Sequence, residues 1–316
     1  MYDDLAIFAI IHFPLCDVNT FLEVYFFMAQ FQIITDSCCD LTEQQYKDLR
    51  VAYAPLSVLY KGTAYDNFND EPILKDFYNG MRSGEMATTS AVNPEGWSMV
   101  TAPALEDGKD ILVLSFSSGL STTYQSAVIA AEELKDRYPE RTIIVVDTLC
   151  AALGQGLLVM RACALRDAGK SLSEVAAWCE ENKLRLAHWV TVDDLAHLKR
   201  GGRISATTAF VGGMLNIKPI IHVDDEGKLQ NVAKARGRKA AIEYLVYKMV
   251  ELADPGDNEI ITIAHGDCLE DARALEEMVR SKCPWVKQVV TGYVGGVIGA
   301  HTGPGVLVVF FMGKHR

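Results

Sequence analysis

The chain has 316 residues, of which 49% are hydrophobic and 22% charged, and its formal net charge is −11 at pH 7. This length and composition are typical of a globular protein with a large core and about two domains. The acidic balance argues against a nucleic-acid partner, because phosphate backbones require a basic surface.

The first 27 residues differ from the rest of the chain. Their apolar run, LAIFAIIHFPL, is too short to span a bilayer, and Asp3 and Asp4 are unlike the basic start of a signal peptide. We therefore expect residues 1–27 to be an extension outside the fold, with the native start at Met28. A short helix for membrane-surface contact or self-association is the alternative interpretation.

From residue 31 onward, β-branched apolar runs alternate with helical patterns. Strands are predicted at FQIITDS, VAYAPLSVLY (interrupted at Pro55), DILVLSF and RTIIVVDT. The helices include LTEQQYKDLR, for which Asp36 and Ser37 are good N-cap residues, and TYQSAVIAAEELKDRY. A polar, turn-rich stretch is expected at 61–80. Continuous apolar strands that alternate with helices predict a parallel sheet with helices on both faces.

The second half of the chain has a more mixed pattern. KPIIHVDDEGKLQNVAKAR predicts a hairpin that turns at 224–227, and a glycine-rich loop is expected before the last strand, GVLVVFF. We therefore predict an α/β protein, with a parallel-sheet domain at 28–190 and a mixed α+β domain at 191–316.

The eight cysteines do not have the CxxC spacing of metal or redox sites. Most of them lie in apolar segments, where a free cysteine behaves as a small hydrophobic residue. We therefore expect no metal, reduced thiols and a cytoplasmic location.

Hydroxyl residues gather at one corner between a strand and a helix, VLSFSSGLSTTYQSA at 113–127. Such a corner offers hydroxyls together with the free N–H groups of a helix start, which an anionic group requires. The corner has no GxSxG nucleophile motif, and the chain has no GxxxxGK[ST] nucleotide motif. Ligands of parallel sheets lie at the carboxyl ends of the strands, so this corner is a candidate binding site.

The segment TDSCCD follows the first strand and offers Asp36 and Asp40. Two carboxylates near a strand end could hold a metal or act as acid and base, or they could cap the next helix. A thiol nucleophile at Cys38 or Cys39 is weakly supported, because nothing places a histidine beside them.

Two further segments carry candidate residues. His301 lies among glycines in GGVIGAHTGPG, where the backbone can approach a ligand closely. Arg203 follows two glycines in LKRGGRIS and is either an anion clamp or an exposed residue after a helix end. A basic cluster at 234–239 is either a solvated surface or a docking site for an acidic partner.

Seven short motifs follow one another along the chain: ITDSCCDL, PLSV, TTSAVNP, SSGLSTTYQSA, LKRGGRIS, NIKPII and GAHTGPG. In this order they resemble the motifs of the DegV family of bacterial lipid-binding proteins, the fatty-acid-carrying subunits of fatty acid kinase. Each motif is weak alone, but the ordered set covers the chain from about Phe31 to its end.

The resemblance implies a long-chain fatty acid in a buried apolar tunnel, with no resident cofactor. The carboxylate of the fatty acid would be bound by Thr89, Ser121 and His301. The residues near this headgroup would be Arg203, Ser90, Thr122 and Ser118. Two departures from the family alter this region: Ala-Val-Asn at 91–93 replaces Q-P-S, and Thr122 replaces a glycine, so its Cβ disfavours a positive φ.

The resemblance further implies a carrier and not an enzyme. The partner would be the catalytic subunit of the kinase, which would phosphorylate the presented carboxylate to an acyl phosphate, and lipid exchange would involve transient membrane contact. We predict that Arg236 and Arg238 dock this partner. The rival interpretation is a phosphotransferase or hydrolase that acts on a small phosphorylated substrate through Asp36, Ser121 and His301.

Overall fold

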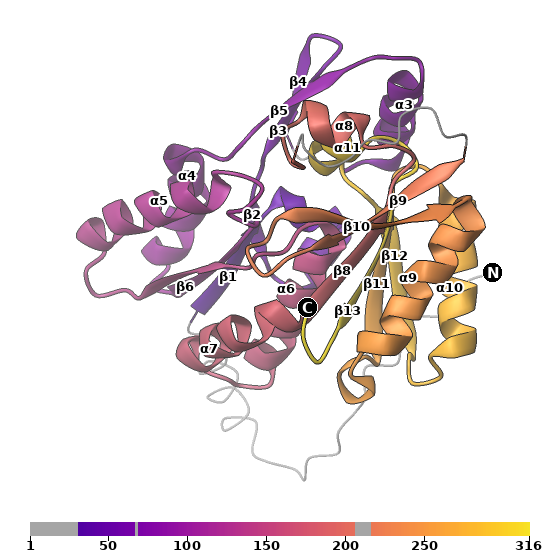
Figure 1. The fold of residues 1–316 in the computed structure, drawn as a ribbon. Helices are drawn as coiled ribbons and strands as arrows, with labels where there is room; N and C mark the ends of the chain where they lie inside the picture. The colour runs from indigo at the N-terminus through magenta and orange to yellow at the C-terminus, as the bar shows by residue number, and fades with distance from the viewer. Residues whose placement is uncertain (1–30, 67–68, 206–215) are drawn as a thin grey trace, which may run out of the picture.

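The computed structural model describes residues 31–66, 69–205 and 216–316. The extension predicted at 1–27 and the start at Met28 lie outside the described residues. Figure 1 shows two sheets side by side, with the chain passing from the first to the second about halfway along its length.

The first sheet has four parallel strands in the order β2-β1-β6-β7. The strands are β1 (Phe31–Asp36), β2 (Ala52–Ala54), β6 (Asp110–Ser115) and β7 (Ile143–Asp147). Side chains alternate along β6, so Ile111 and Val113 pack with one set of helices while Leu112 and Leu114 pack with the other. The predicted parallel sheet with two covered faces is therefore confirmed.

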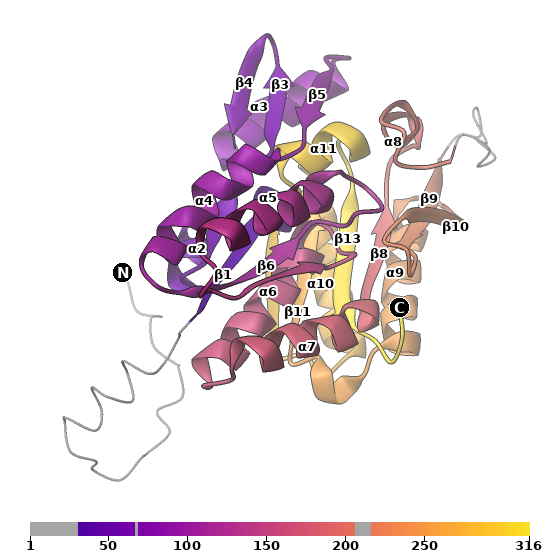
Figure 2. The ribbon, with the colours of Figure 1, turned by 90° about the vertical axis from the view of Figure 1, so that its left-hand side faces the viewer.

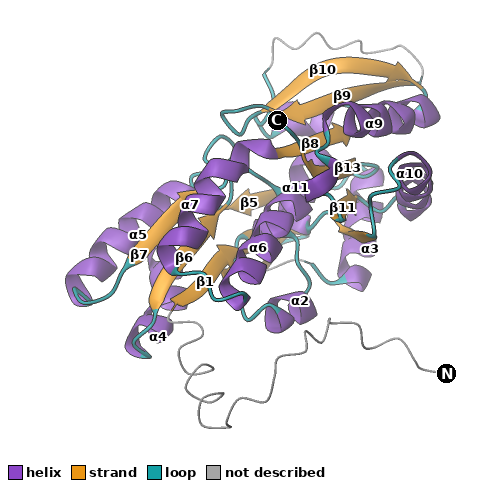
Figure 3. Ribbon diagram, turned by 90° about the horizontal axis from the view of Figure 1, so that it is seen from below, coloured by secondary structure: helices purple, strands orange, loops and turns teal. Residues whose placement is uncertain are grey.

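Helices cover both faces of this sheet. One face carries α4 (Pro94–Glu106) and α5 (Thr123–Arg137), and the other carries α6 (Ala152–Asp167) and α7 (Leu172–Asn182). The short α2 (Glu43–Asp48) lies after the 3-10 turn η1 (Ser37–Cys39). Figure 3 shows α6 between the two sheets, where its largely buried surface contacts both.

The second sheet has six strands in the order β10-β9-β8-β13-β11-β12. The strands are β8 (Leu186–Thr191), β9 (Ile217–Val223), β10 (Leu229–Arg236), β11 (Ile260–His265), β12 (Gln288–Tyr293) and β13 (Leu307–Met312). Only β11 and β12 pair in parallel, and β9 and β10 form the predicted hairpin. The domain boundary predicted at 190–191 falls within β8, and we propose to place it before this strand.

The outer face of the second sheet is covered by α9 (Arg238–Leu252) and α10 (Leu269–Lys282). A small third sheet of β3 (Ser57–Tyr60), β4 (Thr63–Asp66) and β5 (Ala87–Ser90) projects from the first sheet with α3 (Glu71–Arg82), as Figure 2 shows. Beside it lies α11 (Gly296–Thr302), which contacts β3 and β5, and α8 (Ala196–Arg200) contacts α11.

Three local predictions were wrong. The stretch 61–80 is not a run of turns, because it contains β4 and most of α3, which Asp70 caps. Asp36 caps η1, and α2 is capped instead by Thr42. The glycine-rich stretch forms α11, so His301 lies in the last turn of a short helix.

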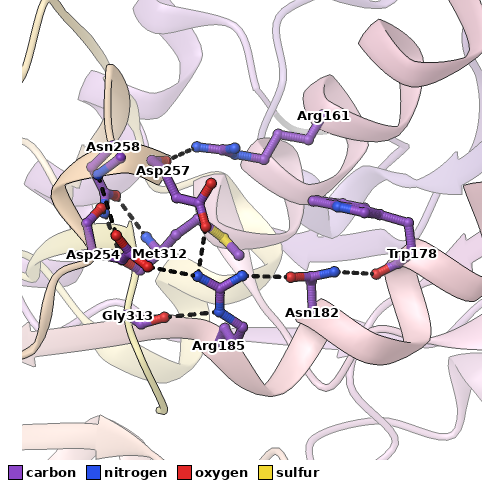
Figure 4. A network of polar contacts seen from close by, with 10 residues as sticks. Arg161, Trp178, Asn182, Arg185, Asp254, Asp257, Asn258, Met312 and Gly313 are labelled. Carbon is purple, nitrogen blue, oxygen red and sulfur yellow. Dashed lines mark hydrogen bonds and ion pairs between the residues drawn. The ribbon is translucent and has the colours of Figure 1, made fainter.

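Figure 4 shows a polar network around Arg185. It lies at the end of the second sheet opposite α11, because Arg185 precedes β8 and Gly313 follows β13, whereas α11 precedes β13. Arg185, directly before β8, donates to Asp257 (2.5 Å), to Asp254 (3.3 Å) and to the amide oxygen of Asn182 (2.8 Å). It also donates to the carbonyl of Gly313, directly after β13 (3.1 Å). These contacts join the start of β8 to the end of β13 and to the turn η3 (Pro255–Asp257).

The cysteines in the described part of the chain are free thiols, and all but Cys268 are buried. None of the helices within those ranges combines the length and apolar character needed to cross a bilayer.

Candidate binding site

A cavity of about 520 Å³ lies between the carboxyl edge of the four-stranded sheet and the inner face of the six-stranded sheet. The loops after β6 and β7 form one wall, α11 forms another, and strands β8, β9 and β13 form the floor. The cavity is therefore where a parallel sheet normally binds its ligand, as the sequence predicts. Its volume is ordinary for a small-molecule site.

Most of the lining is apolar. Its larger apolar members are Leu56, Phe116, Leu120, Val190, Leu198, Ile221, Val223, Leu229, Val294, Val297, Ile298, Val306, Val308 and Phe310. Such a surface gains free energy by covering an apolar ligand, because water is released from both.

Polar side chains gather at the end of the cavity near α11. His301 comes from the last turn of this helix, and its Nε2 lies 2.8 Å from the hydroxyl of Thr89 on β5. Both residues line the cavity. Strand β5 and α11 are in contact, and this packing brings together two residues that lie more than 200 positions apart in the sequence.

Ser121 lines the same cavity and lies just before α5. Its oxygen accepts a hydrogen bond from the backbone N–H of Thr123 (3.2 Å) and lies 2.8 Å from the Thr123 hydroxyl. Thr122 has φ −79°, so the threonine that replaces a glycine here needs no left-handed backbone. The start of α5 can therefore offer hydroxyls and helix N–H groups together to an anion.

Arg203 supplies a positive charge to the same end of the cavity. Its Nε donates to the carbonyl of Leu120 (3.1 Å) and its Nη1 donates to the carbonyl of Gly201 (2.6 Å). These bonds hold the guanidinium against the hydroxyl corner without bringing a negative charge to it. Burial, together with the charge of Arg203, lowers the pKa of His301 from 6.5 to about 4, so the imidazole is neutral at pH 7.

The structure brings together most of the residues predicted for the site. The cavity is lined by Thr89, Ser121, His301, Arg203, Thr122 and Ser118. Ser90 is the exception: it is exposed and lies outside the lining, because neighbouring residues of a strand point to opposite faces and Thr89 faces the cavity.

The two residues predicted for docking differ in their surroundings. Arg236 is exposed at the end of β10. Arg238 forms an ion pair with Asp271 (2.8 Å) and donates to the sulfur of Cys268 (3.3 Å), so its charge is already engaged within the protein.

Asp36 has a structural environment. Its two oxygens accept hydrogen bonds from the backbone N–H groups of Cys38 (3.1 Å) and Phe116 (2.7 Å), and burial raises its pKa to about 6. It caps the 3-10 turn η1 and not α2, and it does not belong to the cavity lining. Within the described ranges, no cluster of three or more His, Cys, Asp or Glu side chains is arranged to hold a metal.

The sequence prediction missed His188, on β8, and Thr302, on α11, which also line the cavity. His188 lies two residues from Leu186 and two from Val190, so the three side chains share one face of an apolar strand. This spacing was the available signal that His188 faces the core.

The fold and the site define an α/β protein with an apolar cavity that carries hydroxyl, imidazole and guanidinium groups at one end. The chain belongs to the DegV family, because residues 30–314 match the family model described as "Uncharacterised protein, DegV family". A DegV domain-containing protein of Clostridium perfringens is 47% identical to it over 290 residues, which cover 92% of this chain and 99% of the relative.

Solved structures of the family have the same fold. A DegV family protein of Thermus thermophilus, described by its fatty acid binding, is 33% identical with a TM-score of 0.79, and the match covers 90% of this chain and 99% of that one. DegV of Bacillus subtilis, described as a fatty acid binding protein, is 28% identical with a TM-score of 0.76 over the same shares of the two chains.

Proposed function

We propose that this chain binds a long-chain fatty acid, with the carboxylate at Thr89, Ser121 and His301 and the tail along the floor of the cavity. The observation that carries the proposal is the cavity of about 520 Å³, apolar over most of its lining and polar near α11. The fatty acid binding described for the Thermus thermophilus and Bacillus subtilis proteins supports it.

The two ends of the cavity would contribute differently to binding. Burying a tail of about 15 methylenes gives on the order of 12 kcal/mol gross, at about 0.8 kcal/mol each. A hydrogen bond to the charged carboxylate contributes about 1.5–3 kcal/mol net, so two or three of them contribute less than the tail. The tail therefore supplies most of the affinity, while Thr89, Ser121 and Arg203 set the orientation of the carboxylate.

We infer that the protein acts as a cytoplasmic carrier and not as an enzyme. It presents the carboxylate to the catalytic subunit of a fatty acid kinase for phosphorylation to an acyl phosphate, and it contacts the membrane transiently to exchange lipid. The acid that the rival enzyme requires, Asp36, is enclosed by backbone N–H groups and is absent from the cavity lining, which favours the carrier.

Lipid extraction and native mass spectrometry of the purified protein test the proposed function. We expect one fatty acid per chain after expression in bacteria, released on denaturation. An empty protein that hydrolyses or transfers a phosphoester would instead support the rival enzyme.

Reversal of the charge at Arg236 is expected to slow association with the kinase subunit severalfold at low salt, and less at high salt, because an exposed charge steers an acidic partner. Stopped-flow association with Arg236→Glu measures this effect. Lys314→Glu is the matched control, because Lys314 is exposed just beyond β13 and the variant changes the net charge equally. Equal slowing by both variants would contradict docking at Arg236.

The Arg238→Glu variant is expected to behave differently from Arg236→Glu. It places a carboxylate against Asp271, with which Arg238 is now paired. We therefore expect a lower unfolding temperature, which differential scanning fluorimetry would record.

A further inference from the structure

The cavity ends part of the way along the strands of the six-stranded sheet. Along β13, Val308 and Phe310 line the cavity, and the next residue on that face, Met312, packs into the core instead. Successive residues on one face of a strand lie roughly 6.6 Å apart, so the cavity closes within one such step beyond Phe310. The polar end at α11 lies at the opposite end of this strand, because α11 directly precedes β13 in the chain.

Strand β8 gives the same limit. Val190 and His188 line the cavity, whereas Leu186, the next residue on that face, packs into the core. His188 and Phe310 are paired in the register of the sheet, and their rings meet edge to face, with centroids 5.1 Å apart and an interplanar angle of 86°. The two rings therefore lie at the far end of the cavity, at the level of the sheet where Val223 and Leu229 also line it.

His188 is held firmly in place. Its Nδ1 donates to the carbonyl of Leu186 (3.0 Å) and its Nε2 accepts from the backbone N–H of Ala151 (3.2 Å), so the ring cannot turn without breaking two hydrogen bonds. Arg316 donates to the same carbonyl of Leu186 (3.2 Å). Burial, with the charge of Arg316 added to it, lowers the pKa of His188 well below 6.5 and keeps the ring uncharged.

Gly154 of α6 packs directly against this pair of rings. A Cβ at this position would lie 2.4 Å from Nε2 of His188 and 2.6 Å from Cδ1 of Phe310, closer than real side chains approach. The position is inside a helix, where alanine is otherwise favoured over glycine. The missing side chain therefore gives the two rings the space that they occupy.

We propose that Gly154, His188 and Phe310 form a stop at the tail end of the cavity that sets the longest acyl chain the protein accepts. The proposal rests on the proposed binding of a fatty acid and adds a selectivity for the length of the acyl chain. An acyl chain that is long enough to reach the rings places its methyl end against them. A longer acyl chain has to bend, or its carboxylate has to leave the headgroup contacts.

Two variants should move the length preference in opposite directions. Phe310→Leu removes a ring and leaves both hydrogen bonds of His188 intact, so the cavity deepens. Each further methylene that fits should then increase the affinity about fourfold, which is about fifteenfold for an acid two carbons longer. Gly154→Ala pushes the rings towards the ligand and should weaken the longest acid bound by the wild type at least tenfold, while an acid a few carbons shorter is retained.

The experiment is a displacement titration of wild type and variants with saturated fatty acids of increasing length. Gly256→Ala is the control, because the nearest atom to its added Cβ is 3.6 Å away, at Asp254 in η3. A wild type that binds no fatty acid would overturn the proposed function itself. A wild type that binds, with the same length preference in Phe310→Leu and Gly154→Ala, would overturn the stop alone.

Discussion

Replacement of Gly201 by alanine is expected to lower the free energy of unfolding by about 1–3 kcal/mol and to weaken binding of a carboxylate ligand. A Cβ at this position would lie 2.3 Å from Nδ1 of His301 and 3.3 Å from two further ring atoms. The backbone of Gly201 has φ −72°, which any residue adopts. The loss would therefore come from displacement of the imidazole, which would break its 2.8 Å contact with Thr89.

Gly169, just after α6, provides the control. It has φ +84°, a Cβ there would meet nothing within 4 Å, and it lies outside the cavity lining, so Gly169→Ala should cost about 1 kcal/mol of backbone strain without touching the site. Urea unfolding and ligand titration of both variants distinguish the two causes. Equal loss of binding in both would show that His301 is not the affected group.

A double variant isolates the collision. In Gly201→Ala with His301→Ala, the ring is absent, so the cost of the alanine at 201 should largely disappear. The unfolding free energies of the wild type, the two single variants and the double variant form a double-mutant cycle. Its coupling energy measures the clash between the Cβ at position 201 and the ring of His301. Additive losses would mean that Gly201 acts on stability through something other than His301.

Part of the site could be predicted from the residues alone, because the hydroxyl corner follows a predicted strand, whereas Thr89 was placed at the site by the resemblance to the DegV family. Parallel strands place their carboxyl ends at one edge, so the hydroxyl corner at Ser121 was expected to face a ligand. Ser90 lies outside the cavity lining, although the resemblance places it near the headgroup. Ser90 points away from Thr89 because the two residues are neighbours in strand β5. This strand forms by pairing with β3, which is distant in the sequence, so local sequence does not reveal it.

The helix α11 could not be predicted from local preferences, because glycine disfavours a helix. The glycine at position 299 is required by tertiary packing. A Cβ there would lie 2.5 Å from the hydroxyl of Tyr78, so only a glycine lets α11 pack against α3. Similarly, nothing near Arg238 in the sequence indicates that Asp271 neutralises it. Both features arise from tertiary packing.

The pH dependence of His301 provides the second large effect. Its pKa is about 4 in the folded protein against 6.5 ordinarily, so between these values the unfolded chain binds more protons. The contribution of His301 to stability is therefore complete above pH 6.5 and is lost as the pH falls towards 4. The variant His301→Gln should lack this component, which unfolding free energies measured across the window would reveal.

Arg203 is one of the two causes of this low pKa, after burial. Arg203→Gln is therefore expected to raise the pKa of His301 part of the way towards 6.5, as followed by the NMR signal of its ring proton. The pKa of His222, lowered by burial and by Arg316, should not move and is the internal control. A bound carboxylate should raise the pKa of His301 in the wild type for the same electrostatic reason, and the methyl ester of the same acid should not. An equal rise with the methyl ester would show that the charge of the headgroup does not control His301, because displacement of water from the cavity would by itself lower this pKa.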